Sequence, residues 1–304
     1  VIQIENVTKR FGRYIAVEDA SLSIEDGDSV ALWGANGAGK TTLIRCVLGL
    51  LRFRGRIRVA GHDVWRAGKA ARVCIGYVPQ ELGFYDELGV GDALGLFARL
   101  KGLGRVDSRA ALAGVGLEGH ERKRIRELSG GMKQRLALAI ALLGDPPILI
   151  LDEVTASLDA VGRREFVGLL ERLSGAGRTM LFASHRIEEV ASLAKRVAVL
   201  DRGRIAGVAS TAEFVARRSD DPAGHAVLHL TIAAQVRTSA LEKLRDQGFS
   251  PQLNGVGVLV PVSAERKALP FRVLADARIP VDDFELVSLA HAAALAAHRE
   301  EDAS

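Results

Sequence analysis

The sequence contains little cysteine and no long hydrophobic run. Its two cysteines, Cys46 and Cys74, are too few for a disulfide framework and are not spaced as metal ligands. Apolar stretches break off well before the ~20 residues that a membrane-spanning helix needs. The first residues alternate like a strand and do not resemble a secretory signal. These absences favour a protein of the reducing cytosol without a membrane span of its own.

Aromatic residues are also scarce, at 5%, whereas hydrophobic residues make up 48% and charged residues 26%. This composition is typical of a globular α/β protein rich in small aliphatic residues. A length of 304 residues predicts one large domain with a smaller appendage. The net charge of +4 is mild, and the Lys and Arg residues read as scattered along the chain. We therefore expect no nucleic-acid partner, and a small polyanionic ligand fits the charge as well.

Hydrophobic periodicity predicts short strands that alternate with helices. The segments 2–7 and 20–24 read as strands, and the continuous apolar runs are typical of a parallel sheet covered on both faces. Predicted strands follow at 29–33, 73–77, 148–151, 179–183 and 197–200, with helices after residue 42, at 132–143 and from 187. This alternation predicts an α/β fold, and the charged, glycine-interrupted stretch within about 85–145 predicts a helical subdomain.

A polar stretch at 219–224 marks the expected boundary between a domain at 1–218 and a smaller one at 225–304. The second domain reads as strand (227–232), helix (239–247), two strands around the Asn254-Gly255 turn, helix (264–277) and strand (283–287). This order predicts a small α+β module of ferredoxin-like or related topology. Its histidines are scattered and have no cysteine partners, so we expect no metal sensor. They are His225, His229, His291 and His298.

Residues 34–42, GANGAGKTT, follow a predicted strand, precede a predicted helix and satisfy the phosphate-loop pattern GxxxxGK[ST]. Glycines let backbone N–H groups wrap around a phosphate, and the helix that follows adds the positive end of its dipole. Lys40 is expected to reach the β- and γ-phosphates of ATP, and the Thr41 hydroxyl to ligate Mg²⁺. The expected nucleotide contacts of this loop are Gly34, Asn36, Gly37, Ala38, Gly39, Lys40, Thr41 and Thr42.

The apolar strand ILILDE delivers two carboxylates, Asp152 and Glu153, at its carboxyl end, where α/β sheets bind ligands. Asp152 suits the coordination shell of Mg²⁺. Glu153 is placed to orient and deprotonate the attacking water. Two acidic residues that merely open a loop are the alternative for this pair alone, and the upstream phosphate loop makes that alternative weak.

A third motif, LSGGMKQR at residues 128–135, supplies a second phosphate-binding element. Ser129 and the amides of Gly130 and Gly131 stand at the start of a predicted helix, which makes an anion site. With this motif the chain resembles the ABC ATPases over roughly residues 1–210. That family resemblance implies a phosphate-loop NTPase core with a mixed sheet, an antiparallel β subdomain and a helical subdomain.

The resemblance also implies a head-to-tail dimer, a homodimer or a pair with a similar subunit, in which ATP lies between the phosphate loop of one copy and the LSGG segment of the other. Gln134 of the same motif is assigned to nucleotide binding. Gln80 in GYVPQE resembles the glutamine that contacts Mg²⁺ and the attacking water, and His185 resembles the switch histidine at the γ-phosphate. The implied catalytic set is therefore Glu153, His185, Gln80 and Lys40, and the implied Mg²⁺ ligands are Thr41, Gln80 and Asp152.

The resemblance assigns two more residues to the nucleotide. Phe11, which precedes a glycine in KRFG, matches the aromatic residue that stacks on adenine, with Tyr14 as its competitor. Asp159 belongs to the loop that crosses the dimer interface. Two residues depart from the family pattern EPTSGLD, because Val154 replaces proline and Ser157 replaces glycine. The catalytic carboxylate is kept, so hydrolysis of ATP to ADP and phosphate remains the expectation.

The chain carries one phosphate loop and one LSGG segment, so it corresponds to one half of a dimer. Residues 81–103 resemble the stretch found in ATPases that pair with ABC-2 type permeases, including drug exporters and the ATPase of nitrous-oxide reductase maturation. This implies export through an integral membrane permease, with the chain on the cytoplasmic side, peripheral on the inner face of the cell membrane. Residues 284–298 resemble the terminal helix of such exporter ATPases. The alternative is a non-transport ATP switch that acts on a soluble or nucleic-acid partner.

Overall fold

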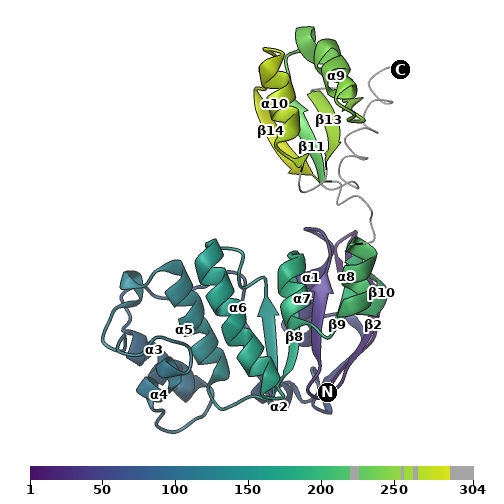
Figure 1. Cartoon of the computed structure of the whole chain (residues 1–304). Coiled ribbons are helices and arrows are strands. Elements are labelled where there is room, and N and C mark those ends of the chain that lie inside the picture. Colours follow the sequence, from purple (N-terminus) through teal and green to yellow (C-terminus); the bar gives the residue numbers. More distant parts are fainter. Residues whose placement is uncertain (220–225, 255–256, 263–265, 288–304) are drawn as a thin grey trace. The chain divides into compact units, whose positions relative to one another are not determined.

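The computed structural model of the chain describes residues 1–219, 226–254, 257–262 and 266–287 (Figure 1). The chain divides into two compact units, Val1–Phe214 and Val215–Ser304. We expected the boundary in the polar stretch 219–224, whereas the division falls within helix α8 (Thr211–Ser219).

The first unit begins with an antiparallel sheet of strand order β2-β1-β4-β5. Its strands are β1 (Ile2–Phe11), β2 (Tyr14–Ile24), β4 (Arg54–Val59) and β5 (His62–Asp63). Both β1 and β2 extend beyond the predicted segments, because the two pair with each other up to a tight turn at which Phe11 lies opposite Tyr14. This hairpin brings two aromatic rings to the same end of the sheet.

A second sheet of six strands has the order β10-β9-β3-β8-β7-β6. Its strands are β3 (Ser29–Trp33), β6 (Ile75–Val78), β7 (Ile148–Asp152), β8 (Thr179–Ser184), β9 (Arg196–Asp201) and β10 (Arg204–Ser210). All of the pairs are parallel except that between β9 and β10. Every residue of β7 and β8 is buried, as expected for strands covered on both faces. The carboxyl ends of β3, β7 and β8 therefore meet at one edge of the sheet.

The predicted strand at 73–77 is wrong at its start. Residues Gly68–Val73 form helix α2, and strand β6 begins only at Ile75. The sequence GKAARV lacks the β-branched and aromatic enrichment of a strand, and the Val73 side chain is 67% exposed. Val73 is thus the last residue of a helix, two positions before the strand begins.

The remaining helices of the first unit are α1 (Lys40–Val47), α3 (Val90–Leu100), α4 (Ser108–Ala113), α5 (Gly130–Leu142), α6 (Ala160–Gly175) and α7 (Ile187–Leu193), with a short 3₁₀ turn at Ile125–Glu127. Figure 1 shows α3, α4 and α5 grouped at the left of the sheet, which is the helical subdomain that the sequence predicts. Helix α7 begins at the predicted residue. Helix α5 begins directly after Ser129, which caps it, where the LSGG motif predicts a helix start. Within the residues described, no helix combines the length and hydrophobicity of a membrane span.

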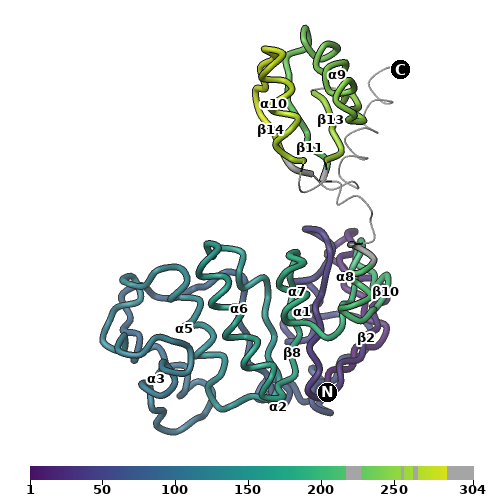
Figure 2. The backbone as a smooth tube through the Cα atoms, in the orientation of Figure 1, coloured from purple at the N-terminus to yellow at the C-terminus, as the bar shows by residue number. Residues whose placement is uncertain are grey.

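The second unit contains β11 (Ala226–Thr231), α9 (Arg237–Asp246), β12 (Gln252–Leu253), β13 (Gly257–Val262), α10 (Leu269–Asp276) and β14 (Asp283–Val287), with a 3₁₀ turn at Ala234–Val236 (Figure 2). The strand order β12-β13-β11-β14 is antiparallel throughout. This order, with helices after the first and third strands, confirms a ferredoxin-like module. Of its histidines only His229 lies in the described part, where its Nε2 is 2.9 Å from Asn254 Nδ2. The stretch from residue 288 lies outside the described residues.

Candidate active site

The phosphate loop joins β3 to α1, and its glycines are required by close backbone packing. A Cβ atom on Gly34 would lie 2.5 Å from the carbonyl oxygen of Leu200. A Cβ atom on Gly39 would lie 2.4 Å from the carbonyl oxygen of Ala16. Gly39 also has a φ of +103°, which residues other than glycine rarely adopt. The loop therefore presents its backbone directly, and the N-terminus of α1 begins at Lys40.

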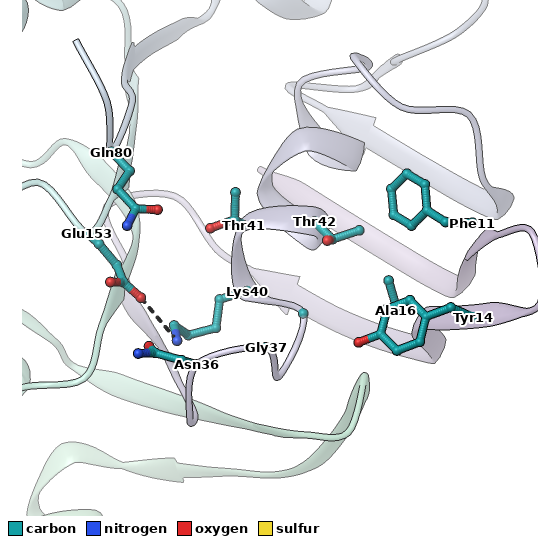
Figure 3. A pocket seen from close by; sticks show the side chains of 11 residues that line it. Phe11, Tyr14, Ala16, Asn36, Gly37, Lys40, Thr41, Thr42, Gln80 and Glu153 are labelled. Atoms are coloured by element: carbon teal, nitrogen blue, oxygen red, sulfur yellow. Dashed lines mark ion pairs between the residues drawn. The ribbon is translucent and has the colours of Figure 1, made fainter.

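Lys40 is buried under this loop, with 4% of its side chain exposed. Its Nζ donates to the carbonyl oxygens of Gly34 at 2.9 Å and Ala35 at 3.2 Å. The same ammonium group lies 3.1 Å from Glu153 Oε1, the contact drawn in Figure 3. A cation held in this way is positioned before any anion arrives, so little side-chain entropy remains to be lost on binding.

Thr41 and Asp152 place two oxygen atoms side by side. The Thr41 hydroxyl donates to Asp152 Oδ1 at 2.9 Å, and Asp152 is 1% exposed at the end of β7. Burial raises the pKa of the Asp152 carboxyl, the hydrogen bond from Thr41 lowers it, and the neighbouring charge of Glu153 raises it again. A hydroxyl and a carboxylate are ligands that fit Mg²⁺. Because burial makes the negative charge of Asp152 unfavourable, a bound cation would offset the cost of burying it.

Glu153 connects the phosphate loop to the end of β8. Its backbone has φ +46°, a left-handed conformation that turns the chain sharply after the strand, and its N–H donates to the Ala183 carbonyl at 3.2 Å. Its Oε2 lies 3.5 Å from Nδ1 of His185, an exposed residue just after β8. One carboxylate thus lies beside both Lys40 and His185. A carboxylate at this position could accept a proton from a water molecule next to a bound phosphate.

Lys40, Thr41 and Glu153 line a cavity of about 350 Å³ (Figure 3), whereas Asp152 and His185 contact lining residues and do not line it themselves. Both aromatic candidates border it, since Phe11 is 47% exposed and Tyr14 61% exposed at the hairpin end. Ala16 also borders it, and no motif in the sequence pointed to that residue. The lining residues are Phe11, Tyr14, Ala16, Asn36, Gly37, Gly39, Lys40, Thr41, Thr42, Gln80 and Glu153. Gly34 and Ala38 do not line it, and both are buried beneath the loop.

The LSGG segment does not belong to this cavity. Ser129 and Gly130 are exposed at the start of α5, and the Ser129 hydroxyl accepts from the Met132 N–H at 3.3 Å. None of the residues 129–131 lines the cavity, and in Figure 1 helix α6 is drawn between α5 and α1. The two segments that the sequence predicts to bind phosphate are therefore apart within one chain.

Gln134, which the resemblance assigns to nucleotide binding, is buried. Its side chain is 2% exposed and points into the interior, because α5 packs the face that carries it against the rest of the subdomain. Asp159 is exposed and caps α6, its Oδ1 accepting from the Gly162 N–H at 2.7 Å. Of the two departures from the family pattern, Val154 is buried and Ser157 is exposed.

Comparison with known proteins identifies the family. The family model described as ABC transporter matches residues 17–156. A daunorubicin resistance ATP-binding protein of Streptomyces coeruleorubidus is 39% identical over 225 residues, which cover 72% of this chain and 71% of that protein. The chain belongs to the ABC transporter family. As an ABC transporter ATP-binding protein it is an ATPase, in agreement with the sequence analysis.

Further relatives of this ABC protein agree in sequence and fold. A linearmycin resistance ATP-binding protein of Bacillus subtilis (strain 168) is 33% identical over 238 residues, or 77% of this chain and 75% of that protein. Among solved structures, a dimeric ATP-binding cassette in a post-hydrolysis state, bound to ADP and Pi, is 25% identical with a TM-score of 0.63. It is matched over 69% of this chain and 99% of its own length. The predicted ABC ATPase fold is thereby confirmed.

Proposed function

We propose that this ABC ATPase powers export through a separate integral membrane permease of the ABC-2 type. The chain covers more than two thirds of relatives named for daunorubicin resistance, linearmycin resistance and Nod factor export. A sulfate/thiosulfate import protein of Chromobacterium violaceum is 41% identical, but the chain covers only 59% of it. Export is therefore the better-supported direction, with the chain bound at the inner face of the cell membrane.

The proposed mechanism follows from the separation of the two segments that we expect to bind phosphate. Lys40 lies in the cavity, whereas Ser129 and Gly130 face solvent elsewhere on the same unit. A second copy placed head to tail would bring its LSGG segment over the cavity and sandwich ATP between the two copies. The dimeric assembly of the ADP-bound cassette named above supports this arrangement. A similar subunit in place of the second copy satisfies the same geometry.

In the ATP-bound dimer each residue has a separate role in hydrolysis. Lys40 and the loop amides hold the phosphates, Glu153 takes the proton from the attacking water, and His185 contacts the γ-phosphate. Thr41, Asp152 and Gln80 would hold Mg²⁺, which supplies positive charge against the phosphate oxygens. Loss of the γ-phosphate removes the bridge between the copies, and the dimer then opens.

Replacement of Glu153 by Gln tests this assignment. The variant keeps the shape of the side chain and loses the proton acceptor, so turnover should fall by roughly a hundredfold or more while ATP stays bound. Size-exclusion chromatography with ATP and Mg²⁺ should then show an accumulated dimer. Parental turnover by Glu153→Gln would show that another group is the base, and full turnover by a lone monomeric copy would exclude the sandwich.

Co-purification tests the transport assignment. If a neighbouring gene encodes a membrane protein, we expect the chain expressed together with it to be recovered in the membrane fraction and to remain in complex with it after extraction in detergent. Failure to recover any membrane partner, together with salt-sensitive binding to DNA or RNA, would instead support the non-transport switch.

A further inference from the structure

Residues 50–73, from the end of α1 through β4 and β5 into α2, form a basic patch. These 24 positions hold seven of the 41 Lys and Arg residues of the chain but only one of its 37 acidic residues, Asp63. Their net charge of +6 thus exceeds that of the whole chain, which is +4. The cations are therefore concentrated in this stretch, whereas we expected them to be scattered along the chain. They are Arg52, Arg54, Arg56, Arg58, Arg66, Lys69 and Arg72.

Contacts link part of this basic patch, around Arg52, Asp63 and Trp65. The Arg52 guanidinium lies 5.7 Å from the centre of the Trp65 ring, which in turn packs 5.7 Å from that of Phe53. Asp63 accepts from the N–H groups of Trp65 and Arg66, and these hydrogen bonds are the first cause of its lowered pKa. Among the residues that the structure describes, none of the seven cations forms an ion pair.

Large apolar side chains stand exposed among these cations. Leu50 is 60% exposed, Trp65 43% and Val73 67%. Lys69, Arg72 and Val73 also border a groove of about 240 Å³ that continues to Leu100, which is 73% exposed. Unpaired cations beside exposed aliphatic residues and a tryptophan are the combination that holds proteins at an anionic membrane surface.

We propose that the basic patch binds the anionic phospholipid surface of the bilayer directly. A cytoplasmic loop of a permease is the weaker partner, because such loops carry an excess of Lys and Arg themselves and would repel the patch. Lipid head groups supply the opposite charge over a broad area, and the patch is spread over several elements. The contact needs neither nucleotide nor permease, so it goes beyond the proposed function.

Vesicle flotation of the full chain without any permease tests the proposal. We expect binding to vesicles of phosphatidylcholine mixed with phosphatidylglycerol, loss of binding at high salt, and none to phosphatidylcholine alone. Affinity should fall roughly fivefold for each cation removed, so Arg52→Ser with Arg66→Ser should lose about twenty-five-fold. The control, Arg105→Ser with Arg122→Ser, removes two exposed cations outside the patch and should bind like the parent.

Trp65→Ser supplies an independent readout, because it should weaken vesicle binding without a change in charge. Equal binding to neutral vesicles, or an equal loss in the control variant, overturns the proposal. Binding to DNA or to an acidic protein segment without vesicle binding also overturns it. ATPase activity in solution should be parental in both double variants, so this result and that of the proposed function are separable.

A different observation concerns Glu189, a buried carboxylate of α7 that is 7% exposed. Its Oε1 accepts from the Thr155 hydroxyl at 2.5 Å, and its Oε2 accepts from the Ser184 hydroxyl at 2.7 Å. Thr155 follows Glu153 by two residues, and Ser184 directly precedes His185. One carboxylate thus ties together the two chain segments that carry the base and the switch histidine.

Two arginines complete the surroundings of Glu189. The Nε atoms of Arg163 and Arg186 lie 4.0 Å and 3.8 Å from its Oε1. Arg163 also donates from Nη2 to the Leu158 carbonyl at 2.9 Å, in the loop that leads to Asp159. The network around Glu189 therefore reaches a third segment, the one that the dimer arrangement assigns to the interface.

We infer that Glu189 is a positioning residue, which holds the segments of Glu153 and His185 in register for hydrolysis. It does not line the cavity, so it acts through its neighbours rather than on ATP. The inference rests on the roles proposed for Glu153 and His185. Because a displacement of about 1 Å at a reacting group lowers rates up to a hundredfold, a defect here should appear in kcat and not in ATP affinity.

Glu189→Gln should lower kcat by roughly tenfold or more and leave the KM for ATP within about twofold of the parent. The matched control is Glu188→Gln, an exposed carboxylate on the same helix, which should behave as the parent. Thr155→Val should share the kcat defect, and Thr155→Ser, which keeps the hydroxyl, should restore it. Parental kcat in Glu189→Gln overturns the inference, whereas parental turnover in Glu153→Gln would contradict the base assignment alone.

Discussion

At the phosphate loop, Lys40 is 4% exposed and its ammonium group has three oxygen partners within 3.2 Å. At the start of α5, by contrast, Ser129 and Gly130 are exposed, and the Ser129 hydroxyl engages the backbone of its own helix. The first element is assembled by one chain before ATP arrives. The second is a helix start whose N–H groups remain directed at solvent, as an anion site supplied to another molecule should be.

The largest expected effect on ATP affinity comes from removal of the buried cation. Lys40→Met keeps much of the side-chain volume but loses the charge and leaves Glu153 without its nearest cation. ATP affinity should fall by roughly a hundredfold, because charge-assisted hydrogen bonds to the phosphates are lost. Equilibrium binding of a fluorescent ATP analogue measures this directly. An affinity close to that of the parent would mean that the phosphates bind elsewhere.

Substitution at the start of α5 should separate turnover from binding. A Cβ atom on Gly130 would meet no heavy atom within 4 Å, so the site tolerates a side chain. Gly130→Asp should not harm the helix, whose N-terminus favours negative charge, but it should repel the phosphate of ATP held by the other copy. We expect turnover to fall by about a hundredfold with ATP affinity unchanged. Gly130→Ala, with no charge, is the control and should retain most activity.

A mixture of these two variants tests the comparison more sharply. Lys40→Met has an intact LSGG segment and Gly130→Asp has an intact phosphate loop, so a mixed dimer contains one complete site. Turnover should therefore appear when two individually inactive preparations are combined, at a level below that of the parent. Phosphate release measured at increasing ratios of the two provides the test. Absence of any recovery, with mixed dimers demonstrated by affinity capture, would exclude composite sites.

Contiguous motifs were predictable, because a short segment sets its own backbone. Strand β3, the phosphate loop and the helix after it follow from the spacing of glycine, lysine and apolar residues alone. The order of strands and helices in the second unit was predictable for the same reason, because clear turn residues separate one element from the next. The boundary at Val73 was not, because one apolar residue at a helix end looks like the first residue of a strand.

Side-chain environments were less accessible to sequence reasoning than backbone segments. Gln134 lies in a recognisable motif, yet its burial depends on what packs against α5. Glu189 is one of two consecutive glutamates, and only the fold shows that it is the buried one with partners from β8 and the loop after β7. The basic patch is similar, because Arg52 and Trp65 are brought together by packing rather than by spacing.

The smallest expected effect lies at the adenine end of the cavity, where Phe11 and Tyr14 face each other across the turn. Loss of a base-stacking ring costs about 1–3 kcal/mol, so the correct alanine variant should bind ATP roughly tenfold more weakly. The Lys9 ammonium already lies 4.5 Å from the centre of the Phe11 ring, which leaves the other face for a base. We therefore expect Phe11→Ala to show the larger loss and Tyr14→Ala the smaller.

Inorganic tripolyphosphate distinguishes stacking from other causes, because it carries the phosphate chain and no base. Its affinity should be the same for the parent, Phe11→Ala and Tyr14→Ala, since both rings lie at the hairpin and not at the loop around Lys40. If ATP and tripolyphosphate both bound more weakly to a variant, the ring would act by shaping the phosphate loop through the neighbouring strand. If Tyr14→Ala alone weakened ATP, the stacking role would belong to Tyr14, and proximity to glycine would be a poor guide to the stacking residue in this chain.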